Sequence, residues 1–494
     1  MNQNSFVTEE ISDRDTSTTS RELVKEVARW KLEAKNEDND RYFFHVREVS
    51  TIEEGDRCYV IGRKGSGKTA ISEYLGRISA PDTFSEKLTF KNFPFNELYS
   101  LKNSGYTGPN QYITLWKYVI YSSICKLMAR NENISSEIKS DLEKIYGNDT
   151  LTLDRRLAKW VGKEFSLNLF GLSIKVSRDP DKAKDLSWIE RVAVLEDIIL
   201  KYADSSRYFI IFDELDEDYR HIIQQAQYEQ YTGLVTSLFK AVQDIKSIFK
   251  DRERYQILPI VFLRDDIYEI IQDADKNKWN DFKIELNWNE DKIKALVAFR
   301  ISRAIDPSTA KVLSFDKAWE RLVGRNQLRV GTNKKTQIDS FDFIARSTYL
   351  RPRDFVKYLQ ACAEEAVHAD GLIHANTIRL VDTAFSNYLK DELRDELFAI
   401  LPDIWATFDV ISQIRKWNFS KMEFEHAYQE QVNRGGFSQK DIGFVLQVLF
   451  LFSVIGNARR HDYYVFRYLH RDARLNFNDR IVVHRGLFKS LQIV

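Results

Sequence analysis

The chain has 494 residues, and its 73 lysine and arginine residues balance 73 aspartate and glutamate residues, so the formal net charge is zero. Hydrophobic residues make up 43% and charged residues 30%, which is ordinary for a globular protein of about two to four domains. The balance excludes a uniformly basic nucleic-acid coat and an acidic tail protein, and leaves local charged patches open.

Cysteine content and hydropathy indicate the cellular compartment in which the protein is expected. The chain has only Cys58, Cys125 and Cys362, far apart and without a C-x-x-C pair, which excludes a disulfide framework and points to a reducing cytosol. The longest apolar run, residues 445–456, is too short to span a bilayer. The N-terminus shows no apolar signal segment. We therefore expect a cytoplasmic protein that does not associate with a membrane.

The N-terminal part is expected to consist of a flexible lead, a helix and a connector. The first 20 residues are rich in Ser, Thr, Asp and Glu and predict a flexible lead, and residues 21–36 carry apolar residues at helical spacing. Residues 41–57 predict a connector with a turn at Gly55.

Short apolar strands then alternate with helical segments up to about residue 290. This alternation predicts a parallel sheet covered by helices on both faces. A mostly helical insertion follows the second strand, with helices expected over 113–130 and 135–147. The expected strands are residues 58–62, 87–92, two short ones within 166–176, 209–212, 257–264 and 281–288.

The first strand ends in a glycine-rich loop, "GRKGSGKTA", in which Gly62, Gly67, Lys68 and Thr69 match the pattern G-x-x-x-x-G-K-[ST]. Glycines let backbone N–H groups approach phosphate, and the helix that follows directs its positive end at the same anion. Lys68 would reach the β- and γ-phosphates, and Thr69 would hold Mg²⁺ through its hydroxyl. The expected nucleotide contacts are Gly62, Arg63, Lys64, Gly65, Ser66, Gly67, Lys68, Thr69 and Ala70.

The strand "YFIIFDE" supplies acidic groups for the same chemistry. Asp213 and Glu214 follow the buried strand 209–212, and ligands bind at the carboxyl ends of parallel strands. We expect Asp213 to hold the metal and Glu214 to polarise the attacking water. A guanine-specific N-K-x-D motif fails at residues 277–281, because Asn280 occupies the aspartate position, and the adjacent Asp-Glu pair resembles that of the additional-strand catalytic-glutamate ATPases.

Four stretches together resemble one bacterial P-loop ATPase family: "GRKGSGKTA", "FPFNEL", "IIFDELDE", and "LRDDIYEIIQDADKNKWND" followed by "LNW". They cover roughly residues 40–370. The family is related to the origin-recognition-like and STAND members of the AAA+ ATPases, and its relatives are often encoded in mobile or anti-phage defence regions. The resemblance implies an α/β parallel sheet of the P-loop NTPase type, a helical lid and a C-terminal winged-helix-like domain.

The resemblance also assigns roles to arginines. Arg264 ends the strand 257–264 in the position of a sensor-1 residue, although a salt bridge with Asp265 or Asp266 is the structural alternative. In "TYLRPRDFVKYLQAC", Arg353 is the first sensor-2 candidate and Arg351 the second, with a helix-capping charge as the alternative. The arginine-finger candidates are Arg220, Arg252 and Arg254.

The C-terminal end predicts helices followed by a strand-rich, basic segment. Residues 457–494 contain seven arginines and one lysine against three aspartates, a net charge of +5 (7 + 1 − 3). Its arginines could contact DNA phosphates, and a protein-docking or autoinhibitory surface is the alternative. The DNA-contact candidates are Arg459, Arg460, Arg467, Arg471 and Arg474.

These patterns predict a four-part protein that hydrolyses ATP with Mg²⁺. The main hypothesis is a switch that forms a homo-oligomer, or regulates a separate effector protein, in anti-phage defence. The alternative is an origin-recognition-like DNA-binding ATPase, such as a loader or transposition helper, and a weaker rival is a P-loop kinase with a small-molecule acceptor. The expected parts are a flexible lead and helix (1–40), an ATPase core with a helical insertion (41–290), a helical lid (291–400) and a winged-helix-like domain (401–494).

Overall fold

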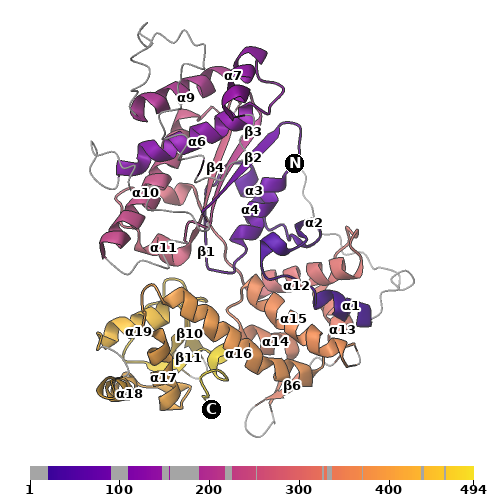
Figure 1. Cartoon of the computed structure of the whole chain (residues 1–494). Helices are drawn as coiled ribbons and strands as arrows, with labels where there is room; N and C mark the ends of the chain where they lie inside the picture. The colour runs from indigo at the N-terminus through magenta and orange to yellow at the C-terminus, as the bar shows by residue number, and fades with distance from the viewer. Residues whose placement is uncertain are drawn as a thin grey trace. The chain divides into compact units, whose positions relative to one another are not determined.

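The computed structural model divides the chain into two compact units. The central unit is His45–Asn287, and the composite unit combines described residues up to Phe44 with those from Trp288 onward. Figure 1 shows the elements of both units. The structure describes residues 20–90, 110–146, 155, 188–216, 225–251, 253–324, 327–330, 336–369, 371–435, 439–460 and 463–493.

The central unit is built on a five-stranded parallel sheet with the strand order β2-β3-β4-β1-β5. The first strand of the chain therefore lies inside the sheet, between β4 and β5, and the second forms an edge. Parallel strands covered on both faces are expected to be apolar along their length, and β1, β3 and most of β4 are buried. The strands are β1 Tyr59–Gly62, β2 Thr83–Thr89, β3 Arg207–Asp213, β4 Gln256–Arg264 and β5 Lys283–Glu285.

Helices cover the two faces of this sheet, with α3 and α4 on one side and α6 and α10 on the other (Figure 1). The Trp116 indole of α6 packs edge-on against Phe212 of β3 and donates to the backbone carbonyl of Leu234 in α10. On the opposite face, the Ser85 hydroxyl of β2 donates to the backbone carbonyl of Gly76 in α4. The helices are α3 Arg47–Glu53, α4 Lys68–Arg77, α6 Ile113–Met128, α7 Ser136–Tyr146, α9 Trp188–Tyr202, α10 Gln225–Ile248 and α11 Asp265–Ile270.

Two local expectations differ from the structure of the central unit, and others are not tested by it. The segment before β1 contains the helix α3 in addition to the turn at Gly55, which has a φ of 74°. The second strand begins earlier than expected, at Thr83. The strands expected within 166–176 and the "FPFNEL" stretch lie outside the described residues.

The composite unit begins with a helical layer, whose elements are given at the end of the next paragraph.

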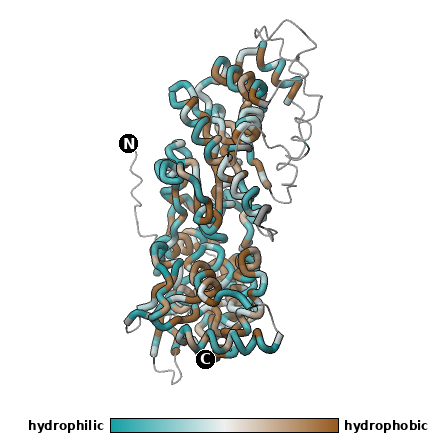
Figure 2. The backbone as a smooth tube through the Cα atoms, turned by 90° about the vertical axis from the view of Figure 1, so that its left-hand side faces the viewer, coloured by the Kyte–Doolittle hydropathy of each residue, from teal (hydrophilic) through white to brown (hydrophobic). Residues whose placement is uncertain are grey.

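None of the described helices combines the length and the apolar character that a bilayer crossing would need. Apolar and hydrophilic residues alternate along the helices of both units in Figure 2, as expected for helices that bury one face. The layer contains α1 Ser20–Val27, α2 Asn39–Tyr42, α12 Glu290–Ile305, α13 Phe315–Leu322, α14 Ser340–Ser347, α15 Pro352–Val367 and α16 Ala375–Leu397.

Two features of this layer were absent from the sequence-based prediction. An antiparallel hairpin of β6 Gln327–Val330 and β7 Thr336–Asp339 interrupts the helices. The helix α1 buries Leu23 and Val27 and packs against α12, α13 and α15. The N-terminal segment is therefore an integral part of the composite unit.

The C-terminal part has the element order of a winged helix. Its order is helix, strand, two helices and three strands, and the strands form an antiparallel sheet of order β10-β9-β11-β8, in which the early strand β8 forms one edge. The elements are α17 Ile404–Ile414, β8 Asn418–Phe419, α18 Lys421–Asn433, α19 Ile442–Leu451, β9 Ile455–Arg460, β10 Tyr463–Val465 and β11 Arg480–Val483.

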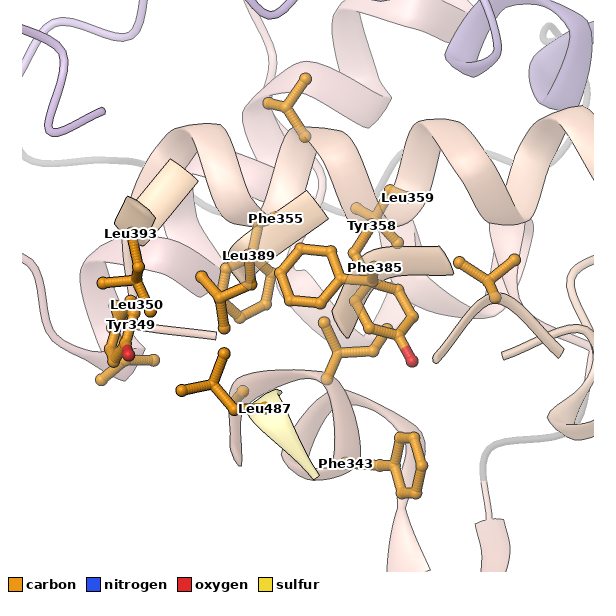
Figure 3. Close-up of a cluster of buried hydrophobic side chains, with 14 of the residues drawn as sticks. Phe343, Tyr349, Leu350, Phe355, Tyr358, Leu359, Phe385, Leu389, Leu393 and Leu487 are labelled. Carbon is orange, nitrogen blue, oxygen red and sulfur yellow. The ribbon is translucent and has the colours of Figure 1, made fainter. Parts of the chain in front are cut away.

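The helical layer and the winged helix share one hydrophobic core. Leu487, which follows β11, lies beside Leu389 of α16 in this core (Figure 3). A Cβ added at Gly486 would lie 2.2 Å from the backbone oxygen of Ser347 in α14, so only glycine permits this approach. The core therefore continues across the boundary expected near residue 400.

Candidate functional site

The glycine-rich loop connects β1 to α4 through backbone conformations that favour glycine. Gly65 and Gly67 have φ values of 79° and 99°, and Gly67 caps the N-terminus of α4. A Cβ on Gly62 would lie 2.6 Å from the Ser66 hydroxyl oxygen and 3.2 Å from Leu286 Cβ, so a side chain there would displace its neighbours. The N-terminus of an α-helix carries backbone N–H groups without intrahelical partners and attracts anions. The loop is therefore shaped to receive a phosphate group.

Lys68, the first residue of α4, bends back over this loop. Its ammonium group donates to the backbone carbonyls of Gly62 at 2.7 Å and Arg63 at 3.0 Å. Burial lowers the pKa of Lys68, although Asp216 and Asp265 act in the opposite direction. A cation held inside the loop by carbonyl oxygens can exchange those contacts for phosphate oxygens.

Asp213 ends β3, and its carboxylate is almost fully enclosed. One oxygen, Oδ2, accepts from the Ser72 hydroxyl of α4 at 2.6 Å and lies 2.9 Å from the Lys87 ammonium of β2. The other, Oδ1, accepts the backbone N–H of Glu214 at 3.0 Å. Ser72 also lies within 3.0 Å of the Thr69 carbonyl, so its hydroxyl joins the loop helix to the acidic strand end.

Glu214 has a left-handed backbone conformation with a φ of 61°. Non-glycine residues in that region store about 1–3 kcal/mol of strain and cluster at functional sites. Asp213 lies within β3, and this backbone reversal gives Glu214 a half-buried position immediately beyond the strand. The two adjacent carboxylates therefore have different surroundings, one fixed by donors and the other nearer to solvent.

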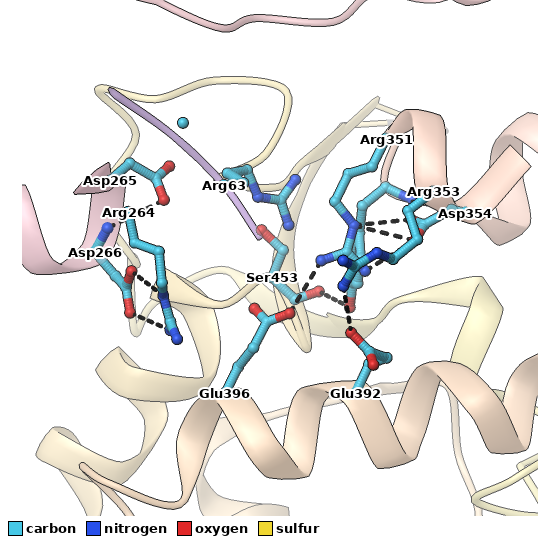
Figure 4. A network of polar contacts seen from close by, with 12 residues as sticks. Arg63, Arg264, Asp265, Asp266, Arg351, Arg353, Asp354, Glu392, Glu396 and Ser453 are labelled. Atoms are coloured by element: carbon cyan, nitrogen blue, oxygen red, sulfur yellow. Dashed lines mark hydrogen bonds and ion pairs between the residues drawn. The ribbon is translucent and has the colours of Figure 1, made fainter. Parts of the chain in front are cut away.

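Arg264 ends β4, the strand that lies between β1 and β3, and its backbone is in register with Gly62 of the loop. The buried guanidinium donates to both oxygens of Asp266, at 3.0 and 2.6 Å, and lies 3.5 Å from Asp216 (Figure 4). The pairing of β4 with β1 thus places Arg264 at the carboxyl ends of the strands, where the loop also begins. The salt bridge expected as the structural alternative is present as well.

The two arginines before and within α15 have different surroundings. Arg351 is buried, and its guanidinium contacts Asp354 at 3.0 Å and Glu396 at 3.1 Å (Figure 4). Although burial lowers its pKa, the two carboxylates raise the pKa of Arg351 overall. Arg353 is partly exposed and pairs with Glu392 at 3.6 Å. Arg353 is therefore the more accessible sensor candidate.

The remaining predicted residues fall into three groups. Arg63, Lys64, Thr69 and Ala70 are half-buried within the loop or the first turn of α4. Arg254 donates to the Leu200 carbonyl at 3.2 Å and lies over the Tyr255 ring. The other arginine-finger candidates, Arg220 and Arg252, lie outside the described residues.

Two side chains that contact Asp213 were not predicted from the sequence. They are Ser72 of α4 and Lys87 of β2. Although burial lowers its pKa, Asp213 and Glu73 raise the pKa of Lys87 overall. Alternation along β2 places Lys87 on the same face as Ser85 and Thr89, but the sequence did not indicate that this face meets α4. The only sequence feature that pointed to Lys87 was its position in an expected strand.

The donor atoms at this site match the chemistry of a magnesium–nucleotide pair. The Thr69 hydroxyl and the Asp213 carboxylate offer oxygen ligands, which Mg²⁺ prefers, together with its own waters and substrate phosphates. The loop offers backbone N–H groups and the Lys68 ammonium to phosphate. Together with the strand order, in which β4 separates the loop strand from the acidic strand, these features define an α/β P-loop NTPase fold of the additional-strand class.

Parts of the chain are similar to known proteins. Residues 291–394, which run from α12 to near the end of α16, match the model of the FunZ-associated C-terminal helical domain. A curated Escherichia coli (strain K12) protein, "Putative transposon gamma-delta 80.3 kDa protein", is 23% identical over 387 residues, covering 73% of this chain and 48% of that protein. The chain therefore spans about half the length of this relative.

Similar solved structures have low identity to the chain. They include Drosophila ORC bound to DNA (11% identity, TM-score 0.29, 100% of this chain and 96% of that chain). They also include Aeropyrum pernix ORC1 in complex with DNA (10%, 0.39, 94% and 96%) and Cdc6p from Pyrobaculum aerophilum (13%, 0.26, 88% and 86%). Because all three TM-scores are below 0.5, the fold assignment rests on the strand order and the loop described above.

Proposed function

We propose that this chain binds ATP with Mg²⁺ and hydrolyses it. The observation that carries the proposal is the 2.6 Å contact between Ser72 of the loop helix and Asp213 of the acidic strand. This contact brings a phosphate-binding loop and a carboxylate pair together at one edge of a parallel sheet, where ligands bind in such folds.

Each residue has a proposed role in this reaction. Lys68 contacts the β- and γ-phosphates, Thr69 and Asp213 hold the metal, and Glu214 orients and polarises the attacking water. Bound Mg²⁺ supplies charge neutralisation at the phosphates. Arg264 and Arg353 sense the γ-phosphate. The loop residues Gly62, Arg63, Lys64, Gly65, Ser66, Gly67, Lys68, Thr69 and Ala70 surround the phosphates.

Two variants test the proposal. Lys68→Ala is expected to lose ATP binding, measured with a fluorescent ATP analogue. Glu214→Gln is expected to retain binding and to release phosphate about 10²–10⁴-fold more slowly, because the general base is lost. Glu137→Gln, an exposed glutamate of α7, is the matched control and should behave as wild type. Normal turnover by Glu214→Gln would show that another group activates the water.

The wild-type protein also distinguishes hydrolysis from phosphoryl transfer to a small molecule. We expect phosphate release from ATP and Mg²⁺ alone. If phosphate leaves ATP only after an acceptor is added, the kinase hypothesis replaces the ATPase.

A second candidate function is a DNA-binding ATPase, such as a loader or transposition helper. The winged-helix element order favours it, and so does the transposon named in the description of the E. coli relative. The exposed residues of α19 and its cap are Asp441, Phe444 and Gln447, which offer no cation to phosphate. Arg459 of β9 and Arg474 are exposed. We therefore propose that the sheet side of the domain, and not α19, contacts the DNA backbone.

Binding to duplex DNA at several salt concentrations tests this candidate. Wild-type affinity should fall steeply with salt, and Arg459→Glu with Arg474→Glu should weaken binding and flatten the salt dependence, because phosphate contacts release counterions. Gln447→Ala is the matched control on α19. Unchanged DNA binding after the charge reversals would exclude contact through these arginines.

The remaining hypothesis is an ATP-ordered homo-oligomer that regulates a separate effector, with anti-phage defence in the cytoplasm as its setting. In that case ATP would shift the protein toward an assembled state. The Glu214→Gln variant with ATP and Mg²⁺ should then elute as a larger species than the nucleotide-free protein.

A further inference from the structure

Lys87 occupies a position in the central unit that the proposed reaction has not yet used. It lies on the edge strand β2, in register with Ile211 of β3. Because Thr89 is the partner of Asp213 in the same register, Lys87 and Asp213 lie on the same face of the sheet. That face is the one covered by α4.

The ammonium group of Lys87 has an acceptor for each of its N–H donors. It lies 2.8 Å from the Ser72 hydroxyl, 2.8 Å from the Glu73 carboxylate and 2.9 Å from Asp213 Oδ2. A lysine ammonium carries three donors, so this set is complete. Lys87 therefore links β2 to both α4 and β3.

This linkage lies in a largely enclosed environment. The side chains of Lys87, Glu73 and Asp213 are 16%, 17% and 3% exposed. Ion pairs that water reaches poorly hold their geometry better than surface pairs, which are mobile and screened. The cluster can therefore transmit the position of the helix to the carboxylate.

The contacts also decide which oxygen of Asp213 remains available. Oδ2 receives both the Ser72 hydroxyl and the Lys87 ammonium, which occupy its two lone pairs. Oδ1 accepts the Glu214 N–H and keeps capacity for a further donor, such as a metal-bound water. Ser72 meanwhile contacts the backbone of Thr69, the other proposed metal-holding residue.

We propose that Lys87 is a positioning residue for magnesium: it holds α4 and Asp213 in the relative geometry that places both metal-holding residues around one ion. This inference rests on the proposed ATPase function. Partners that orient metal ligands typically change metal affinity or activity by about 10–100-fold when they are removed.

The test compares ATP binding with and without magnesium in the full chain. For Lys87→Met, we expect the Mg²⁺ concentration that gives half-maximal enhancement of ATP-analogue binding to rise about tenfold or more. Binding of the analogue in EDTA should change little, because Lys87 makes no contact with the loop itself. Lys87→Arg, which retains the positive charge, should raise the Mg²⁺ requirement less than Lys87→Met.

The opposite face of the same strand supplies a matched control. Lys126 of α6 pairs with Glu86, the neighbour of Lys87, at 2.9 Å, and both are buried. Lys126→Met removes a buried lysine from the same strand's surroundings without touching Asp213. Its Mg²⁺ requirement should equal that of wild type, whatever its loss of thermal stability.

Two results would overturn the proposal. A purely electrostatic role predicts tighter Mg²⁺ binding by Lys87→Met, because a cation beside the metal is removed. An unchanged Mg²⁺ requirement in a folded Lys87→Met would show that Asp213 needs no such support. If Lys87→Met does not fold, Glu73→Gln decides the question. This variant removes one of the two carboxylate partners of Lys87, and an unchanged Mg²⁺ requirement rejects the proposal.

Failure of this inference is distinct from failure of the proposed function. A wild-type protein that binds no ATP analogue would reject the ATPase proposal itself. A wild-type protein with magnesium-dependent binding, matched by Lys87→Met, would reject only the role of Lys87.

Discussion

Buried charged side chains occur in both units of this protein, but in different surroundings. In the central unit, Lys87 lies with Asp213 and Glu73 beside α4, the helix that follows the glycine-rich loop. In the composite unit, Arg351 lies between helices with Asp354 and Glu396, and these three side chains are 3%, 0% and 8% exposed. The former cluster adjoins a loop that can admit a ligand, whereas the latter is closed by protein on all sides.

The comparison teaches that burial and charge alone do not identify a functional residue. Both clusters contain an enclosed cation with two carboxylates, because an enclosed charge must be paired. Both clusters lie at a helix N-terminus, and what distinguishes them is the chain before it. The left-handed Gly65 and Gly67 precede α4 in the central unit, whereas in the composite unit Arg351 itself caps α15 and Asp354 accepts the Tyr349 N–H. We therefore expect variants in the two clusters to fail in different ways.

The largest expected effect is on the stability of the composite unit. Arg351→Met leaves Asp354 and Glu396 without their shared cation, and should lower the free energy of unfolding by about 3–5 kcal/mol. Chemical denaturation monitored by circular dichroism measures the loss. A stability equal to wild type would mean that this cluster is not a structural one, and the contrast between the units would disappear.

The next effect is on chemistry in the central unit. Asp213→Asn preserves the shape of the side chain but removes the negative charge that the metal needs, so turnover should fall about 10²–10³-fold. Stability should change far less than for Arg351→Met, because Lys87 retains Glu73 as a partner. Phosphate release and denaturation together separate the two quantities. A large loss of stability with normal turnover would show that Asp213 has a structural role and not a catalytic one.

A smaller effect is expected at Arg353, two residues from Arg351 and partly exposed. Arg353→Met should lower the free energy of unfolding by much less than Arg351→Met, because Arg353 has one long ion pair, 3.6 Å from Glu392, and its side chain is 28% exposed. If Arg353 senses nucleotide, the variant should nevertheless hydrolyse ATP more slowly. Normal turnover would remove Arg353 from the site and leave α15 with a structural role only.

The smallest effect concerns a surface carboxylate of the winged helix. Lys416, with the Ser420 backbone, lowers the pKa of Glu423 from 4.5 to about 2. Because the folded pKa is depressed, Glu423 stabilises the protein above pH 4.5 and loses that contribution as the pH falls toward 2. Its exposure limits the loss to under about 1 kcal/mol. Glu423→Gln should reduce the acid sensitivity in denaturation experiments from pH 6 to about pH 3.

Much of the central unit could be predicted from local sequence. The loop from Gly62 to Thr69 was recognisable because phosphate binding restricts both residue type and spacing. The acidic strand end was recognisable because an apolar run followed by Asp213 and Glu214 fits a buried strand that reaches a ligand edge. The strand order then placed these two segments as the prediction required.

Other features depended on contacts between distant segments. Lys87 became meaningful only when β2 paired with β3 and both lay under α4. The membership of α1 in the composite unit likewise depends on packing, since Arg300 of α12 stacks on Trp30 and Tyr42 and pairs with Glu37. No local pattern in residues 20–44 indicates which unit their apolar face joins.

The amino-acid sequence by itself determined the chemistry of the loop and of the acidic strand end, because phosphate and metal ligands require particular groups at short, fixed spacings. It also ranked Arg353 above Arg351 without a structural reason. Only the tertiary structure decided that Arg351 is enclosed by Asp354 and Glu396, and that Lys87 supports Asp213. Such roles arise from the pairing of distant strands and helices, and sequence spacing does not encode those distances.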